Sequence, residues 1–456
     1  MNASTHAENA ANDIAAHLHP FTNLATHPQL GPLVIQRGDG IFVEDDQGRR
    51  YLEAMSGLWC ASLGFSNARL AKAGSEALHG LPYYHTFNGR SNPAAIALAE
   101  KLLSLAPVPM SKVFFANSGS EANDSAVKLV WYYHNAIGKP EKKKIIARRN
   151  AYHGVTVAAA SLSGLVPNHR DFDLPIDRIL HVDCPHHFRY AEAGESEQDF
   201  ATRLAAALEQ RILDEGPETV GAFIAEPVMG AGGVLVPPAT YFDKVQKVLA
   251  KYEVLLIADE VICGFGRTGQ MFGSTTFGLR PDILTAAKAL SSGYVPISAV
   301  MVSEKVHAAV AANSGKIGTF GHGFTYSGHP VACAIALETL KVYEDENILA
   351  HVQSLVPQFQ KGLQSHAARK YVGEVRGVGL IGAIELYADP AKRTPFDPAQ
   401  KAGTHLAELA LAQGLIVRAM GDSIAFCPPL IITAGQIDDM FARFGRAMAI
   451  FEESFA

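Results

Sequence analysis

Short apolar runs alternate with amphipathic helical stretches along the middle of the chain. From about residue 112 onward, five runs are typical of buried strands: residues 113–116, 145–147, 220–225, 254–258 and 297–302. Apolar residues at helical spacing behind Thr240 predict a capped helix between two of these runs: Tyr241, Val245, Val248, Leu249 and Tyr252. Strands that alternate with helices predict an α/β fold with a mainly parallel sheet.

The last part of the chain has a different pattern. Residues 378–386 and 415–417 are predicted strands among helices, and a Cys-Pro-Pro break follows at residues 427–429. We therefore expect a smaller α+β domain from about residue 331.

Composition and charge narrow the functional class. The chain has 456 residues, of which 48% are hydrophobic, so it can bury large cores and is not a disordered chain. This length suggests about two or three domains, as in an enzyme. The net charge of −6 gives no overall positive field that could attract a polyanion. The basic residues between 142 and 149 flank the apolar residues 145–147 and form only a local basic stretch. Nucleic acid is therefore not an expected partner.

Cysteines and the N-terminus indicate the compartment. The five cysteines are scattered and form no C-x-x-C pair, so neither a disulfide framework nor a zinc ribbon is indicated. Residues 1–20 lack a cationic segment followed by an apolar one, and no apolar run reaches the ~18 residues of a membrane span. We expect a cytosolic protein without a membrane partner.

A Ser/Gly turn follows the first of the predicted strands. Ser118 and Glu121 have the spacing of a capping box at the start of a helix. Free N–H groups and the helix dipole, together with the hydroxyls of Ser118 and Ser120, can bind a phosphate there. A capped strand–helix turn without a ligand fits the same residues, so both interpretations stay open.

Two carboxylates follow the run 254–258. Asp259 and Glu260 are expected where a buried parallel strand ends, which is where ligands bind in such sheets. A buried carboxylate needs a cation or hydrogen-bond donors, because an unpaired buried charge is costly. The partner is either a ligand or a nearby arginine such as Arg267.

Lys288 is the only charged residue between residues 283 and 290. Burial among apolar neighbours lowers the pKa of a lysine, which an imine-forming nucleophile requires. The common alternative is a surface lysine on a short helix, with its ammonium group in solvent.

Three further sequence patterns are weaker evidence for a ligand site. Residues 264–269 and 377–382 match G-x-G-x-x-G, but neither string has the preceding strand and following helix of a dinucleotide site. We interpret both as chance matches. The segment Cys184-Pro185-His186-His187 has no second ligand cluster nearby in the sequence, so we interpret it as a loop and expect no metal.

Together, the motifs resemble those of the class III pyridoxal-phosphate-dependent aminotransferases, and within them the ω-amino acid or amine:pyruvate transaminases. The resemblance spans nearly the whole chain and rests on Asn117-Ser118-Gly119-Ser120-Glu121-Ala122, Tyr152-His153-Gly154, Glu226-Pro227, Ala258-Asp259-Glu260-Val261, Gly264-Phe265-Gly266-Arg267-Thr268-Gly269, Ala287-Lys288 and Phe324-Thr325-Tyr326-Ser327-Gly328-His329-Pro330. It implies the α/β fold of fold-type I enzymes, with a seven-stranded, mainly parallel sheet flanked by helices in a large domain, residues 61–330. A smaller α+β domain would combine the N-terminal segment, residues 1–60, with residues 331–456.

The resemblance implies which residues hold the ring of pyridoxal 5'-phosphate (PLP). Lys288 forms the imine link to the cofactor, and Asp259 pairs with the pyridine nitrogen. Protonation of that nitrogen makes the ring an electron sink. Tyr152 and Val261 contact the two faces of the ring, and Glu226 supports the site near Asp259.

The cofactor phosphate involves two subunits in this family. The resemblance implies that Ser118, Gly119 and Ser120 hold it at a helix start, while Phe324 and Thr325 reach the phosphate of the partner subunit. A homodimer is therefore implied, and further pairing to a tetramer stays open.

The resemblance also implies a substrate site formed by Phe21, Trp59, Tyr84, Phe87, Tyr152 and Arg418. Trp59 matches an aromatic residue at the substrate entrance, and Arg418 matches a mobile arginine that binds substrate carboxylates. Without the resemblance, Trp59 would be a core aromatic residue and Arg418 an arginine on an edge strand.

We therefore expect a transaminase that moves an amino group from an ω-amino acid, diamine or amine to pyruvate, giving alanine by a ping-pong mechanism. Lys288 would act as base and acid. The amino donor, the stereopreference and the pathway are left open by the sequence. Alternatives are an aminomutase or decarboxylase on the same scaffold and, outside this class, an NAD-dependent oxidoreductase that rests on the glycine strings.

Overall fold

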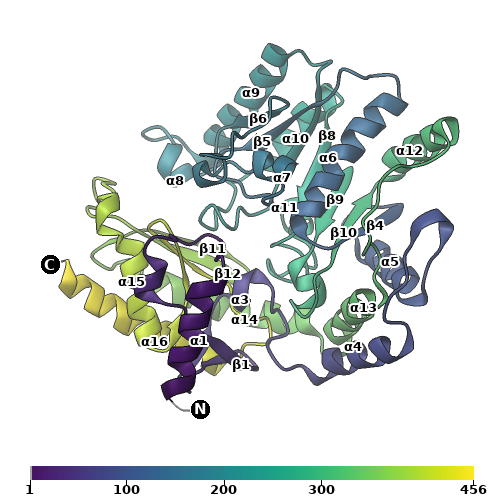
Figure 1. Ribbon diagram of the computed structural model, residues 1–456. Helices are drawn as coiled ribbons and strands as arrows, with labels where there is room; N and C mark the ends of the chain where they lie inside the picture. Colours follow the sequence, from purple (N-terminus) through teal and green to yellow (C-terminus); the bar gives the residue numbers. More distant parts are fainter. Residues whose placement is uncertain (1–2, 456) are drawn as a thin grey trace.

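Seven strands form the central sheet of the computed structural model, which describes residues 3–455 (Figure 1). Their spatial order is β4 (Lys112–Ala116), β10 (Ser298–Val302), β9 (Ile283–Ala286), β8 (Leu255–Asp259), β7 (Val220–Ala225), β5 (Lys144–Arg148) and β6 (Ile179–Val182). Strand β10 is antiparallel to β4 and to β9, and the other neighbouring pairs are parallel. The expected α/β fold with a mainly parallel, seven-stranded sheet is confirmed.

Helices cover both faces of this sheet, because alternate residues of its strands point to opposite sides. Ala222 and Ile257 pack in one core with residues of α6 (Gly119–Ala136), α7 (Val157–Leu162) and α12 (Glu304–Ile317). Phe223 and Leu256 pack in another core with residues of α5 (Pro93–Leu105), α9 (Glu197–Glu215), α10 (Tyr241–Lys251) and α13 (Pro330–Asp345). The large sheet is the middle layer of a three-layer arrangement (Figure 1).

The five apolar runs predicted as strands are strands, with ends that differ by at most one residue. Strands β6 and β9 were not predicted. In β6, His181 interrupts the apolar pattern at an edge of the sheet. Strand β9 has four residues and continues into the apolar residues around Lys288, so periodicity alone could not separate it from a helix.

The helix expected after Thr240 is α10, but the predicted cap is wrong. Thr240 has a left-handed backbone with φ of 66°, and its side chain forms no capping hydrogen bond. An extended backbone is what places an N-cap hydroxyl over the first turn, so this conformation removes the cap.

Two four-stranded sheets lie beside the large one. The first joins β1 (Ile35–Asp39), β2 (Phe42–Asp45) and β3 (Arg50–Glu53) to β13 (Leu415–Ile416), with β13 parallel to β3. The second has the order β11 (Val372–Val378), β12 (Ile381–Leu386), β15 (Ser423–Phe426) and β14 (Arg418–Met420). The predicted strand 378–386 is thus the turn and second strand of a hairpin. The two ends of the chain fold together, whereas domain boundaries at residues 60 and 330 stay a prediction.

The remaining helices connect these layers. They are α1 (Ala3–Ala16), α2 (His27–Leu30), α3 (Ser56–Trp59), α4 (Ala68–Gly80), α8 (His187–Tyr190), α11 (Gly273–Phe277), α14 (Ile348–Gln364), α15 (Ala402–Ala412) and α16 (Ala434–Ser454), with 3-10 turns η1 (Phe87–Gly89), η2 (Val166–Asn168), η3 (Lys288–Ser291) and η4 (Pro398–Gln400). Within residues 3–455, no helix is both long and apolar enough to cross a membrane.

Candidate active site

The carboxyl ends of several strands of the large sheet surround one cavity. Asp259 is the last residue of β8, Glu226 follows β7 directly, and Lys288 lies two residues after β9. This edge is where parallel sheets bind ligands. The cavity has a volume of about 880 Å³, and predicted site residues in its lining are Phe21, Trp59, Gly119, Ser120, Tyr152, Glu226, Asp259, Val261, Lys288 and Arg418.

Lys288 begins the turn η3 with a left-handed backbone, φ 49°, which is uncommon for a residue other than glycine. Burial lowers the pKa of Lys288, and the acidic groups Cys60, Asp259 and Glu226 nearby oppose this effect. Among the described residues, none forms a hydrogen bond with its ammonium group. Lys288 is therefore a cavity residue, not a solvated surface lysine, and a lowered pKa suits imine formation.

The Asp259 carboxylate is held by side chains from distant segments. Its Oδ2 lies 2.7 Å from His153 Nδ1 and accepts a hydrogen bond from Asn123 Nδ2 at 2.8 Å. Its Oδ1 accepts from the N–H of Val261 at 3.1 Å. Asn123 is oriented in turn, because its Oδ1 accepts from the Thr285 hydroxyl at 2.9 Å. The side chain of Asp259 is 3% exposed, so these contacts fix a buried negative charge.

Arg267 is not the partner of these carboxylates. Its Nη1 donates to the carbonyl oxygens of Leu380 at 2.9 Å and Pro428 at 2.6 Å. Neither glycine string lines the cavity. Arg267, which belongs to the first string, instead contacts the C-terminal part of the chain. The arginine-pairing alternative for Asp259 is therefore wrong, and the glycine strings form no phosphate loop here.

Helix α6 starts beside the cavity. Ser118 Oγ accepts from the N–H of Glu121 at 3.2 Å, whereas the Glu121 carboxylate accepts from the N–H of Asn117 at 2.7 Å, so the capping box is only half formed. Ser118 itself is exposed and does not line the cavity. The N–H groups of Gly119 and Ser120 have no backbone acceptor within the described part of the chain. They can bind an anion at the positive end of the helix dipole.

Glu226 organises the next wall of the cavity. Its Oε1 accepts from the N–H of Tyr152 at 3.1 Å, and its Oε2 accepts from the N–H of Gly230 at 3.0 Å. Glu226 is 2% exposed, and burial raises its pKa. It therefore positions Tyr152 through the backbone.

Arg418, Trp59 and Phe21 also line the cavity. Burial lowers the pKa of Arg418, and among the described residues no carboxylate forms an ion pair with it. Trp59 is 3% exposed and has a left-handed backbone, whereas Phe21 is 70% exposed. The cavity thus contains a cation without an acidic partner.

Tyr84, Phe87, Phe324 and Thr325 do not line the cavity of their own chain. The carbonyl oxygen of Thr325 accepts from the Tyr83 hydroxyl at 3.0 Å, so the segments around residues 84 and 325 lie against each other. Tyr84 and Phe87 are 43% and 44% exposed. The place of Tyr84 and Phe87 in the substrate site therefore stays a prediction, since neither lines the cavity of its own chain.

Three residues of the site were not predicted: Asn123, His153 and Thr285. His153 belongs to the quoted motif Tyr152-His153-Gly154, but its neighbours do not reveal its partner. Asn123 is a buried polar residue between the apolar residues Ala122 and Ala126 of α6. A buried amide on an apolar helix face is the signal that could have found it.

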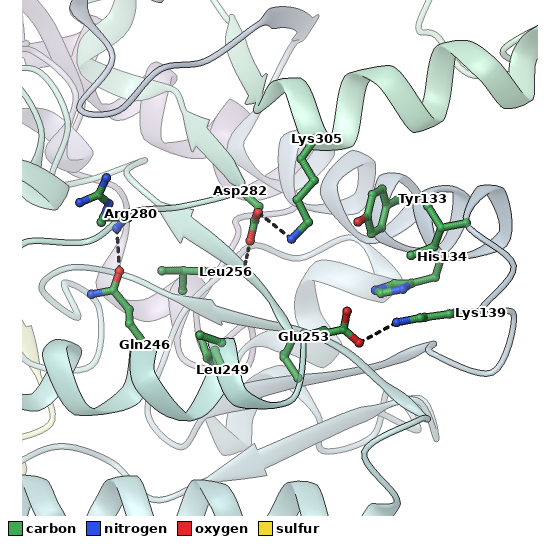
Figure 2. A pocket seen from close by; sticks show the side chains of 13 residues that line it. Tyr133, His134, Lys139, Gln246, Leu249, Glu253, Leu256, Arg280, Asp282 and Lys305 are labelled. Carbon is green, nitrogen blue, oxygen red and sulfur yellow. Dashed lines mark hydrogen bonds and ion pairs between the residues drawn. The ribbon is translucent and has the colours of Figure 1, made fainter.

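A second cavity, of about 460 Å³, lies at the opposite end of β8 and β9 (Figure 2). Four of its charged side chains form two ion pairs, Lys139 with Glu253 at 2.6 Å and Lys305 with Asp282 at 3.3 Å, and Arg280 also lines it. None of the predicted site residues lines this second cavity.

Comparison with known proteins decides the family. The sequence profile of aminotransferase class-III matches residues 24–448. The chain belongs to the class-III aminotransferases. It is 51% identical to the mitochondrial gamma-aminobutyrate transaminase 1 of Oryza sativa subsp. indica over 440 residues, which cover 96% of this chain and 85% of that protein. The protein is therefore an aminotransferase with the expected fold-type I structure, and the oxidoreductase alternative is wrong.

Two solved structures are closely similar to this aminotransferase. The omega transaminase of Pseudomonas jessenii in complex with PMP has a TM-score of 0.97 and 55% identity, with 98% of each chain covered. A structure described as a transaminase with L-Ala has a TM-score of 0.92 and 57% identity, covering 93% of this chain and all of that one. The cofactor of the enzyme is PLP.

The residues of the cavity fit this cofactor. A lysine of lowered pKa suits the imine, the buried Asp259 carboxylate suits a protonated pyridine nitrogen, and the unpaired N–H groups of Gly119 and Ser120 suit a phosphate. These three groups line one cavity, so a single molecule can reach all of them.

Proposed function

We propose that this aminotransferase transfers an amino group from an ω-amino acid or a simple amine to pyruvate, giving alanine in a ping-pong reaction. The observation that carries the proposal is Arg418, a half-buried cation that shares a cavity with Lys288 and has no acidic partner among the described residues. Such a guanidinium can bind a carboxylate with two hydrogen bonds. The named relatives support the substrate class, since one is a transaminase of gamma-aminobutyrate and another holds L-alanine.

The chain's own residues would divide the work. Bound PLP supplies a carbonyl group that carries the amino group and a ring that withdraws electrons. Lys288 Nζ takes the proton from the substrate carbon that bears nitrogen, and in the second half-reaction it gives a proton to the keto carbon of the acceptor. His153 and Asn123 hold the Asp259 carboxylate, which places a negative charge beside the ring nitrogen. Gly119 and Ser120 bind the phosphate, with Ser118 capping their helix, while Tyr152, Val261 and Glu226 enclose the ring.

A donor and acceptor panel tests the proposed reaction. The holoenzyme is incubated with gamma-aminobutyrate, a diamine or 1-phenylethylamine, and with pyruvate or 2-oxoglutarate as acceptor. Alanine should form from pyruvate with at least one of these donors, faster than glutamate forms from 2-oxoglutarate. A clear preference for 2-oxoglutarate with every donor would contradict the proposed acceptor.

We also propose a homodimer in which Phe324 and Thr325 serve the partner's site. Exposed aromatic side chains around these residues support an interface: Tyr83, Tyr84, Phe87 and Tyr326 are each between 42% and 57% exposed. Mixed dimers of a Lys288→Ala chain and a Thr325→Asp chain provide the test. If Thr325 acts across the interface, both lesions fall in one site and the other site is active; if it acts within its own chain, the mixed dimer is inactive.

A further inference from the structure

Three histidines surround one carboxylate at the end of helix α1. Asp13 Oδ1 lies 3.3 Å from His17 Nδ1, and Asp13 Oδ2 lies 2.7 Å from His19 Nε2 and 3.2 Å from His27 Nε2. The rings of His17 and His19 have centroids 4.2 Å apart, and those of His19 and His27 are 4.4 Å apart. Among the described residues, no lysine or arginine forms an ion pair with Asp13. We call these four residues the N-terminal cluster.

The spacing of these atoms is close to that of metal ligands. A tetrahedral cation with ligand bonds of about 2.0–2.2 Å holds its ligand atoms about 3.3 Å apart. Each histidine nitrogen lies 2.7–3.3 Å from an oxygen of Asp13, that of His17 from Oδ1 and those of His19 and His27 from Oδ2, so the contact with His19 has to open by about 0.6 Å. Ligand atoms of Asp13, His17 and His19 all lie within 4.8 Å of one another, and His27 joins this group only through its contact with Asp13 Oδ2.

The ligand chemistry selects the cation. Three imidazole nitrogens and one carboxylate oxygen suit zinc and its neighbours, whereas Mg²⁺ and Ca²⁺ prefer oxygen ligands. We propose that Asp13, His17, His19 and His27 bind one divalent cation of the zinc class. The expectation of no metal was argued from Cys184–His187 and did not weigh these residues.

The place of the cluster suggests what the ion does. Pro20 and Phe21 line the active-site cavity, and they lie between the ligands His19 and His27. At its other end, α1 is held by Asp46, which lies 2.7 Å from His6 Nδ1 and accepts from Asn9 Nδ2 at 3.1 Å. An ion that joins His19 and His27 to Asp13 ties the loop 20–26 to a docked helix. It would therefore order Phe21 at the wall of the cavity.

Metal binding can be measured on the holoenzyme without a histidine tag, after removal of adventitious metal with a chelator. Co²⁺ is the first probe because tetrahedral Co²⁺ has visible absorption bands, and Zn²⁺ should then displace it. We expect one ion per chain. His27→Gln, and the pair Asp13→Asn with His19→Asn, should weaken binding by at least about 100-fold, since loss of a ligand costs more than loss of its supporting contacts.

Two control variants separate this site from others. His79→Gln changes a surface histidine of α4 whose Nδ1 contacts the Ser75 carbonyl oxygen, and should bind Co²⁺ as the wild type does. His186→Gln tests a second group of possible ligands, His186, Glu374 and Glu385, and should also leave binding unchanged. Cofactor absorbance and melting temperature show whether each variant is folded.

Several results would overturn the proposal: no saturable Co²⁺ binding by the wild type, binding that survives both N-terminal variants, or binding abolished by His186→Gln. Hydrogen exchange supplies a readout that does not depend on activity. Zn²⁺ should slow exchange of residues 17–27 in the wild type and leave it unchanged in His27→Gln. Equal exchange with and without Zn²⁺ in the wild type would refute the ordering of the loop.

Discussion

Arg418→Ala should separate the two half-reactions of this enzyme. Arg418 lies in the active-site cavity at the start of β14, and no carboxylate of the described residues pairs with it. A charge-assisted hydrogen bond to a substrate carboxylate contributes about 1.5–3 kcal/mol. Because about 1.4 kcal/mol corresponds to a factor of ten, the half-reaction with pyruvate should slow by about 10- to 150-fold. The half-reaction with 1-phenylethylamine, which has no carboxylate, should change by less than about threefold.

Stopped-flow absorbance of the cofactor measures both half-reactions under single-turnover conditions. Arg189→Gln is the matched control, because Arg189 lines the same cavity but its Nη2 pairs with Glu385 at 2.5 Å. This control should change the pyruvate half-reaction much less than Arg418→Ala does. Equal losses with pyruvate and 1-phenylethylamine would mean that Arg418 is structural. Arg267 could not replace it, because backbone carbonyl oxygens already occupy its guanidinium.

Three further changes test other parts of the site and of the fold. Lys288→Ala should abolish turnover and the covalent cofactor link but not folding, and borohydride reduction with peptide mapping of the wild type should label Lys288 and no other lysine. Asp259→Asn should keep bound cofactor and lose about 150- to 5,000-fold in single-turnover rate, because loss of a buried charged partner costs about 3–5 kcal/mol; a near-normal rate would refute this role. His134 is 1% exposed, and burial lowers its pKa from 6.5 to about 4. The folded state therefore binds this proton less readily than the unfolded chain, and the stability that neutral His134 provides is lost as the pH falls from 6.5 toward 4. Between pH 7 and pH 5 the wild type should lose about 2 kcal/mol more unfolding free energy than His134→Gln in urea titrations, and parallel pH profiles would contradict the shift.

The central strands could be predicted because burial on both faces leaves a continuous apolar run. Residues 220–225 are the clearest case, since every residue of β7 is buried. Strand β9 could not be predicted in the same way, because its four residues are continuous with the apolar stretch around Lys288. Only the pairing of β9 with β8 and β10 distinguishes it from the turn that follows.

Part of the chemistry of the site could also be predicted from an apolar run in the sequence. Asp259 follows a predicted apolar strand, so the sequence alone indicated that it lies at the ligand-binding edge of the sheet, whereas Lys288 was recognised only as a single charge in an apolar stretch. The donors that hold Asp259 are different, because His153 is 106 residues away and Asn123 is 136 residues away. No local pattern specifies such pairs.

The sequence by itself determined the alternation of strands and helices, the order of the motifs and the residue types that supply the chemistry. The tertiary structure decided which of these residues meet. It joins Asp259 to His153 and Asn123 and gives Arg267 carbonyl oxygens as partners. The reason is that strands of the large sheet are neighbours in an order that differs from their order along the chain. Hydrogen bonds between the segments that follow these strands therefore depend on the packing of the whole sheet. They do not depend on the spacing of residues in the sequence.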